Sequence, residues 1–245
     1  MARIAVYSLK GGVGKTTVAV NLAWCSARQS ARRTLLWDLD PQAASTYLLG
    51  IAPRPKRRAQ AVFSRDIDPA DLVRHTDIDR LDLIPADTSL RTLDLLFHEI
   101  DKKKRLAKLL GQLDKSYDRL LLDCPPGLTE TSEQVMRAAD LILIPVIPSP
   151  LSQRAFEEVS AHFADRGFKA ALMPVHSMVD RRRTLHRDAI ARHPDWPVLP
   201  MASIVEAMTA ERRPVGALSP RSQGARAFAQ LWTRVERRLA DIEAS

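Results

Sequence analysis

The 245-residue sequence lacks the features that disulfide-stabilised and membrane-spanning chains need. Its two cysteines, Cys25 and Cys124, are too few for a disulfide framework or for a four-thiolate metal site within one chain. No run approaches the ~20 apolar residues that cross a bilayer. Residues 1–7 read as a strand that runs into glycines, without the apolar core and cleavage site of a signal peptide. These absences favour a reduced, cytoplasmic setting.

Hydrophobic residues and positive charge are present in quantity. Hydrophobic residues make up 45% of the chain, which is enough to bury a sizeable core and excludes wholesale disorder. The 37 Lys and Arg exceed the 29 Asp and Glu, for a net charge of +8. Residues 181–245 hold twelve basic and seven acidic residues, so +5 of the +8 lies in the last quarter. This excess favours a polyanionic partner.

Short apolar runs alternate with longer helical patterns along the chain. We expect strands at 3–8, 33–38, 81–85, 118–123, 140–147 and 170–175. We expect helices near 15–29, 88–115, 131–138, 151–165, 181–193 and 222–241. Several strands are apolar almost throughout, as parallel strands covered on both faces are. The pattern predicts an α/β fold with one doubly wound, mostly parallel sheet flanked by helices, and residues 1–245 as a single domain.

Two segments lack a regular pattern. Residues 51–60 carry two prolines and four basic residues and are expected to form an exposed loop. Residues 194–220 contain five prolines, which predicts a long irregular segment before the last helix.

A glycine-rich segment directly follows the first expected strand and opens a helix. Residues 10–17 read KGGVGKTT; their backbone N–H groups and the helix N-terminus are suited to phosphate oxygens. Lys15 would bridge the β- and γ-phosphates, and the Thr16 hydroxyl would bind Mg²⁺. The strict phosphate-loop pattern has glycine at position 9, where this chain has Leu9, and a second lysine, Lys10, follows. The expected nucleotide-binding residues of the loop are Gly11, Gly12, Val13, Gly14, Lys15, Thr16 and Thr17.

Aspartates follow two other expected strands. Asp123 ends an apolar strand, where a carboxylate lies beside the nucleotide crevice and can hold Mg²⁺ through a water. Asp38 and Asp40 follow the second strand and lie two residues apart, so in an extended chain they point the same way. Either could address the metal or the attacking water. Taken singly, an aspartate that ends a strand is often only a helix cap.

These residues together resemble the ParA/MinD group of deviant phosphate-loop ATPases. In the signature of that group the first glycine is dispensable and the extra lysine is diagnostic. The stretch 38–42 (DLDPQ) is similar to the ParA branch in particular. Further stretches that match this branch are 84–86 (IPA), 122–126 (LDCPP) and 220–225 (PRSQGA). The likeness covers nearly the whole chain.

The resemblance implies an ATP- and Mg²⁺-dependent homodimer that hydrolyses ATP slowly until a partner stimulates it. Lys10 would reach across a two-fold interface to the phosphates of the other subunit, and Gly11 would allow the close approach. Asp40 would orient the hydrolytic water, with Asp38 supporting Mg²⁺ and Asp123 in its outer coordination sphere. The catalytic residues would then be Lys10, Lys15 and Asp40, and the metal-site residues Thr16, Asp38 and Asp123.

The same resemblance places further residues near the nucleotide. Ser177, Met178, Pro200 and Met201 match positions that flank the adenine. Asn21 matches a recurrent polar position of the family, although a role on the helix surface fits equally well.

Partition proteins of this type bind DNA non-specifically as ATP dimers, and their basic side chains neutralise phosphates. Two clusters match places where family members carry DNA-contacting arginines: Arg181, Arg182, Arg183 and Arg187, then Arg212, Arg213 and Arg221. Any single arginine of this kind could instead solvate a helix. The run 102–105 (KKKR) could equally be a solvated helical face. The expected partners are non-specific DNA, which would give a nucleoid association, and a ParB-like or cargo adaptor protein that stimulates hydrolysis.

Three alternatives remain within this resemblance. A MinD-like membrane cycle would use the amphipathic last helix, although packing of that helix on the sheet is favoured. An iron–sulfur reductase needs paired cysteine ligands, which the positions of Cys25 and Cys124 do not support. A positioner of a protein cluster or organelle would use the same ATPase. The six histidines show no i, i+4 pairing of the kind that a helix-borne zinc site uses.

Overall fold

The computed structural model describes residues 1–52, 58–64, 67–100 and 104–244. Its strands are β1 (Ala2–Val6), β2 (Thr34–Asp38), β3 (Arg74–His75), β4 (Leu81–Ile84), β5 (Arg119–Asp123), β6 (Leu141–Val146), β7 (Ala171–Val179) and β8 (Val198–Pro200). The helices of its first half are α1 (Lys15–Arg28), α2 (Ala44–Leu48), α3 (Ala61–Ser64), α4 (Leu93–Ile100) and α5 (Arg105–Leu113). Those of its second half are α6 (Glu130–Ala138), α7 (Pro150–Asp165), α8 (Thr184–Arg192), α9 (Ser203–Glu211), α10 (Val215–Leu218) and α11 (Gln223–Ala244). Two 3₁₀ helices, η1 (Pro69–Leu72) and η2 (Thr88–Thr92), complete the described elements.

The strands form one sheet in the order β3-β4-β2-β5-β1-β6-β7-β8. All neighbours are parallel except β3, which runs antiparallel to β4. This confirms the predicted doubly wound, mostly parallel sheet. β1 lies between β5 and β6, with β2 and β4 on one side and β7 and β8 on the other. The end of β1 is therefore a point where the strand order reverses, which is where open α/β sheets bind ligands.

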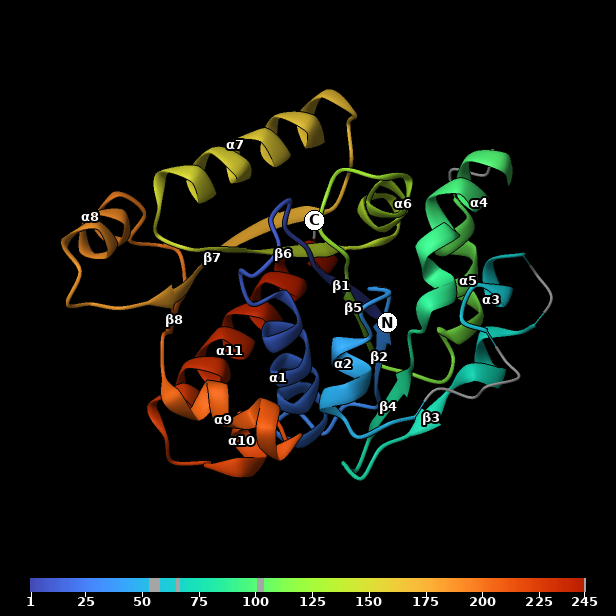
Figure 1. Cartoon of the computed structure of the whole chain (residues 1–245), viewed down its shortest axis with the longest axis horizontal. Helices are drawn as coiled ribbons and strands as arrows, with labels where there is room; N and C mark the ends of the chain where they lie inside the picture. The colour runs from blue at the N-terminus through green and yellow to red at the C-terminus, as the bar shows by residue number, and fades with distance from the viewer. Residues whose placement is uncertain (53–57, 65–66, 101–103, 245) are drawn as a thin grey trace.

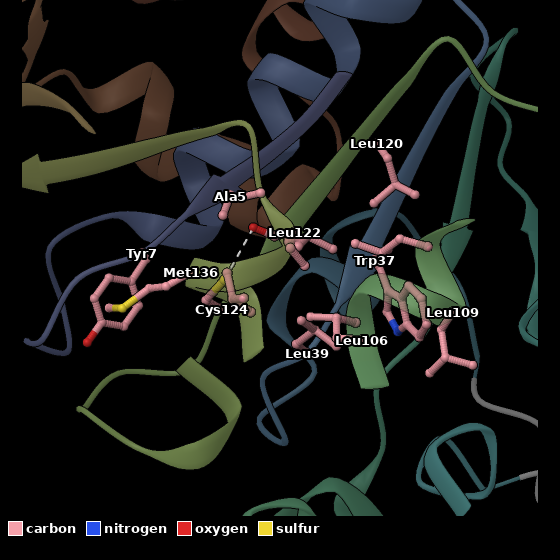
Figure 2. Close-up of a cluster of buried hydrophobic side chains, with 14 of the residues drawn as sticks. Ala5, Tyr7, Trp37, Leu39, Leu106, Leu109, Leu120, Leu122, Cys124 and Met136 are labelled. Carbon is pink, nitrogen blue, oxygen red and sulfur yellow. Dashed lines mark hydrogen bonds between the residues drawn. The ribbon is translucent and has the colours of Figure 1, made fainter. Parts of the chain in front are cut away.

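Helices cover both faces of the sheet (Figure 1). Helices α4, α5, α6 and α7 lie on one face, and α1, α2, α9, α10 and α11 lie on the other. Successive strand residues point to opposite faces of the sheet. Leu120 and Leu122 belong to the core under α5 and α6, whereas Leu121 belongs to the core under α1 and α11. Figure 2 shows the first of these cores, where Trp37 lies beside Leu106 and Leu109. Burial on both faces explains why these strands are apolar almost throughout.

The last helix lies on the sheet, as the favoured interpretation of its pattern predicted. Phe228, Leu231, Trp232, Val235 and Leu239 are all buried in the core that also contains α1. The apolar face of α11 is therefore covered by the chain's own core. Within the described ranges, no helix combines the length and the apolar character needed to cross a membrane.

Several predicted element bounds were wrong, and β7 continues to Val179, four residues beyond the expected end of that strand at 175. The expected helix 88–115 is divided into η2, α4 and α5, and the helix expected at 181–193 begins only at Thr184. The segment 194–220 is not irregular, because it contains β8, α9 and α10. Its prolines occupy positions that regular elements tolerate: Pro200 ends an edge strand and Pro214 is the N-cap of α10.

Two charged segments differ from their predictions. In the expected exposed loop 51–60, residues 53–57 lie outside the described residues, and Ala59 is buried. Of the basic run 102–105, residues 102 and 103 lie outside the described residues. Arg105 is buried, and its guanidinium donates to the carbonyls of Val62 and Phe63 at 2.8 and 3.0 Å. For this arginine the interpretation as a solvated helical face was wrong, because a guanidinium that satisfies backbone carbonyls is stable in a core.

Candidate nucleotide and metal site

Strand register brings the predicted site residues to one edge of the sheet. Asp38, the last residue of β2, is the register partner of Asp123, the last residue of β5. Asp123 is in turn paired with Val6, after which the glycine-rich loop begins. Carboxyl ends of neighbouring parallel strands meet at the same edge, so two carboxylates and the loop converge there.

The glycine-rich loop closes on itself and on β7. Gly12 and Gly14 have φ of +72° and +90°, a left-handed conformation that side chains disfavour. The Lys15 ammonium donates to the Lys10 carbonyl at 3.1 Å, and the Ser177 hydroxyl of β7 donates to the Val13 carbonyl at 2.8 Å. These two hydrogen bonds fix the conformation of the loop next to the N-terminus of α1.

Two opposing factors act on the pKa of the Lys15 ammonium. Its side chain is largely buried, and burial lowers the pKa of its ammonium, while the charges of Asp123 and Asp40 act in the opposite direction. The Lys15 ammonium can donate charge-assisted hydrogen bonds to phosphate oxygens. Because the nearby carboxylates already supply negative charge, a phosphate bound here would also need a cation such as Mg²⁺.

The two buried aspartates are both held by helix α2. Thr46 donates to the Asp38 carboxylate twice, from its backbone N–H at 2.9 Å and from its hydroxyl at 2.7 Å. The Ser45 hydroxyl donates to Asp123 at 2.7 Å. Sequence reasoning missed these two residues. The adjacent hydroxyls, a few residues after Asp40, were the only signal.

Asp123 retains one carboxylate oxygen for a ligand. Its Oδ1 is buried and has no hydrogen-bond partner among the described residues. Burial raises the pKa values of both Asp38 and Asp123, and the Asp123 charge raises that of Asp38 further. The nearby Thr16 hydroxyl lowers the pKa of Asp123. A hydroxyl beside an unpartnered buried carboxylate oxygen is an oxygen donor set of the kind that Mg²⁺ takes, so these residues fit the ion.

Asp40 lies closer to the surface than the other two aspartates. It is half-buried, its carboxylate accepts from the Gln42 N–H at 2.9 Å, and its own N–H donates to Asp38 at 3.2 Å. It lines a cavity of about 680 Å³ together with the loop. The other lining residues are Gly11, Gly12, Gly14, Lys15, Thr16, Thr17, Pro41, Gln42, Pro125, Pro126 and Met178.

A smaller apolar cleft of about 40 Å³ adjoins this cavity, and the two share Gly14, Thr17 and Met178. Ser177, Met178 and Pro200, which were predicted to flank the adenine, all line this cleft. Met201 does not line it but lines a separate groove, to which Pro200 also contributes. Met178 has φ of +53°, which is rare for a side chain of its size.

The predicted DNA-binding arginines fall into separate places. Arg181, Arg182 and Arg183 directly precede α8 and Arg187 lies within it, at one end of the sheet (Figure 1), whereas Arg212 and Arg213 lie between α9 and α10. Arg181 and Arg182 line the groove that Met201 lines, and its volume is about 850 Å³. Two arginines of α11, Arg226 and Arg234, line the same groove and were missed by sequence reasoning.

These arginines differ in the hydrogen bonds and ion pairs that their side chains make within the chain. Arg182 pairs with Asp180 at 2.9 Å, and Arg187 donates to the carbonyls of Arg181 and Arg182. Arg213 donates to the Ala217 carbonyl at 3.2 Å, and Arg212 contacts Tyr47. Within the described ranges, the guanidinium groups of Arg181, Arg183 and Arg221 have no hydrogen-bond or ion-pair partner, and all three residues are exposed.

Asn21 is buried, so the helix-surface interpretation was wrong. Its amide donates to the Thr17 carbonyl at 2.8 Å and to the Met208 sulfur at 3.3 Å, and its oxygen accepts from the Val215 N–H at 2.8 Å. It ties α1 to α9 and α10.

Part of this chain matches a family model and several curated proteins. A family model described as an AAA domain matches residues 1–165. The sporulation initiation inhibitor protein Soj of Bacillus subtilis is 37% identical over 145 residues, which cover 58% of this chain and 57% of Soj. A ParA family protein of Chlamydia pneumoniae is 33% identical over 163 residues, which cover 65% and 64% of the two chains. The match thus spans less than two thirds of the length of these curated relatives.

Solved structures share the fold over nearly the whole chain. Apo McdA of Cyanothece has a TM-score of 0.83 at 21% identity, covering 96% of this chain and 98% of McdA. The cell division ATPase MinD of Pyrococcus furiosus has a TM-score of 0.80 at 24% identity, covering 96% and 98%. At these identities the likeness shows the fold alone. With the family match over residues 1–165 and the phosphate loop described above, the chain belongs to the ParA/MinD family of deviant Walker-A ATPases.

Proposed function

We propose that this chain is a ParA-type ATPase that dimerises with ATP and Mg²⁺ and then binds DNA non-specifically. Partner-stimulated hydrolysis releases the dimer, and repeated cycles segregate DNA or position a cargo. The observation that carries the proposal is the convergence of a buried lysine, an unpartnered carboxylate oxygen and a glycine-rich loop at one sheet edge. Phosphoryl transfer needs mainly positioning and charge neutralisation, which such a site supplies.

Each residue then has a distinct task. Lys15 neutralises the phosphates, and Thr16, Asp38 and Asp123 would hold Mg²⁺ directly or through water. When bound, Mg²⁺ would neutralise charge that develops on the phosphate oxygens. Asp40, half-buried at the cavity wall, accepts a hydrogen bond from the attacking water and orients it.

Dimerisation draws support from two loop residues that the chain itself leaves unused. The Lys10 ammonium makes no hydrogen bond or ion pair with the described residues, although its carbonyl accepts from Lys15. Gly11 is exposed, and a Cβ built on it would meet no atom within 4 Å. A lysine without a partner beside an open backbone position is suited to reach the phosphates of a second subunit.

DNA binding draws support from the exposed arginines around α8. Arg181 and Arg183 lie on the surface, have no partner within the described ranges and adjoin the arginine-lined groove. Guanidinium groups placed in this way can pair with backbone phosphates without reading sequence. We propose that DNA contacts centre on these residues, with Arg213 and Arg221 as further contacts.

Salt-dependent DNA retention with ATP tests this proposal. Replacing Arg181 and Arg183 by alanine removes two phosphate contacts from each subunit and four from the dimer, so the slope of log K against log salt should fall in magnitude by about 3.6. The matched control is Arg237→Ala with Arg238→Ala, which removes the same charge from an exposed stretch of α11 and should leave the slope unchanged. Equal slopes for all three proteins would place the DNA contact elsewhere, and retention independent of ATP would contradict the switch.

A membrane cycle has less support, because the apolar residues of α11 are buried in the core. An iron–sulfur centre has less support too, because Cys25 and Cys124 are buried and burial raises the pKa values of both thiols. Whether the cargo is DNA or a protein assembly depends on the stimulating partner. A ParB-like centromere binder encoded beside this chain would indicate DNA segregation and a nucleoid location.

A further inference from the structure

The short helix α2 is held from two sides. On its inner side, Ser45 and Thr46 donate hydrogen bonds to Asp123 and Asp38. On its outer side, Arg212 contacts Tyr47: its Nε donates to the Tyr47 carbonyl at 2.9 Å, and its guanidinium lies 4.6 Å from the centre of the Tyr47 ring. A helix of five residues is not stable on its own, so contacts of this kind determine where its hydroxyls lie.

Arg212 makes its contact with Tyr47 from a strained backbone. It caps α9 with φ of +51° in the left-handed region. Glycine is the usual residue at such a helix end, because a side chain there costs conformational energy. A non-glycine residue persists in this region where surrounding contacts hold it, and such strain clusters at functional positions.

Helix α9 connects Arg212 to the nucleotide site by a second route. Met208 of α9 accepts a hydrogen bond from Asn21 of α1, the helix that begins at the phosphate loop. Val205 of α9 lines the apolar cleft beside Met178. The element that ends at Arg212 therefore contacts the helix of the phosphate loop and the expected adenine cleft.

We propose that Arg212 is a positioning residue for the Mg²⁺ site, acting through α2, and not a DNA contact. By holding Tyr47 it fixes α2, so that Ser45 and Thr46 keep Asp123 and Asp38 in place for the ion. This inference rests on the proposed ATPase function, because the aspartates matter only if the site takes Mg²⁺ with a nucleotide. It also separates Arg212 from its neighbour Arg213, which remains available to DNA.

Two substitutions remove the contact from its two ends. Arg212→Gly removes the guanidinium and suits the left-handed backbone, so the thermal stability of the free protein should not fall. Tyr47→Ala removes the ring and keeps the carbonyl. The control is Arg237→Ala, which removes the same charge from an exposed position of α11.

The first readout is the Mg²⁺ concentration that gives half-maximal ATP hydrolysis without DNA. Arg212→Gly and Tyr47→Ala should raise it about threefold to tenfold, below the 10–100-fold effect of removing a direct partner of a metal ligand. The turnover at saturating Mg²⁺ should stay within about twofold. The double variant should be no worse than the stronger single variant, because both remove one contact. Arg237→Ala should leave the Mg²⁺ requirement unchanged.

The second readout is amide hydrogen exchange of residues 44–48 in the nucleotide-free protein, which does not depend on ATPase activity. Exchange should be faster in Arg212→Gly than in the wild type and in Arg237→Ala. An unchanged Mg²⁺ requirement overturns the inference, and so does unchanged exchange. If the wild type neither binds nor hydrolyses ATP, the proposed function fails, and the exchange measurement then decides by itself whether Arg212 holds α2.

Discussion

The substitution Gly11→Ala distinguishes the role of the phosphate loop within one subunit from its role at the interface with a second subunit. A Cβ at Gly11 would meet nothing within 4 Å, and its backbone lies outside the left-handed region. A methyl group there costs nothing within the subunit. Because alanine restricts the unfolded chain, the free energy of unfolding should rise by about 0.4–1 kcal/mol. For a chain of this size that is a melting temperature about 1–4 °C higher.

The same methyl should be costly in the ATP-bound dimer. If Gly11 is glycine because two backbones approach closely, a methyl group overpacks that contact by about 1–3 kcal/mol. A two-fold interface contains the substitution twice, so the total is about 2–6 kcal/mol. At about 1.4 kcal/mol per tenfold, the dimer should weaken at least about 30-fold.

The assay pairs thermal unfolding with sedimentation in the presence of ATP and Mg²⁺, and with ADP binding to the monomer. Gly11→Ala should keep its stability and bind Mg–ADP within about threefold of the wild type, a difference below 1 kcal/mol, while it fails to dimerise. Gly14→Ala is the contrasting control, because Gly14 has φ of +90° and its Cβ would lie 3.3 Å from the Ser177 hydroxyl. A Gly11→Ala protein that dimerises like the wild type would refute the cross-subunit explanation. Equal loss of ADP binding would show that the phosphates themselves require this glycine.

Three further predictions concern the site and its supports. Asp40→Ala should slow ATP hydrolysis by about 10²–10⁴-fold, the range for a positioned proton acceptor. The variant should therefore accumulate on DNA as an ATP-bound dimer. A variant that stays monomeric with ATP would contradict ATP-dependent dimerisation. Mg–ADP at 100 times its Kd should stabilise the wild type by about 2.7 kcal/mol, which raises the melting temperature by about 5–11 °C. Lys15→Ala or chelation of Mg²⁺ should abolish this rise. An undiminished rise in the presence of EDTA would argue against the metal site. Gly216→Ala would place a Cβ 2.2 Å from the Trp24 ring, so urea unfolding should show a loss of about 3 kcal/mol or more; an unchanged midpoint would mean that α10 moves away from α1 at little cost.

Much of the site was predictable because it consists of local patterns at strand ends. The loop 10–17 and the aspartates follow apolar runs, and parallel strands deliver their carboxyl ends to one edge. The residues that support the site were not predictable in this way. Ser45 and Asn21 act through partners that are 78 and 194 residues away in the sequence, and α2, which carries Ser45 and Thr46, is too short to leave a periodic signal.

The basic residues show the same division between sequence and structure. Twelve of them in residues 181–245 marked the last quarter as positive. The sequence could not separate Arg181, which is exposed without a partner, from Arg212, which contacts Tyr47. Nor could it show that Arg105 is buried beneath α3 carbonyls.

The sequence by itself therefore determined the fold class, the phosphate loop and the aspartates, because two-sided burial and glycine chemistry are encoded in neighbouring residues. Tertiary structure decided which side chains support that site: α9 and α10 lie on α1, Arg212 holds α2, and one oxygen of Asp123 remains without a partner. These contacts depend on how α2, α9 and α10 pack over the sheet, and local sequence patterns do not encode contacts between residues that are distant in the sequence.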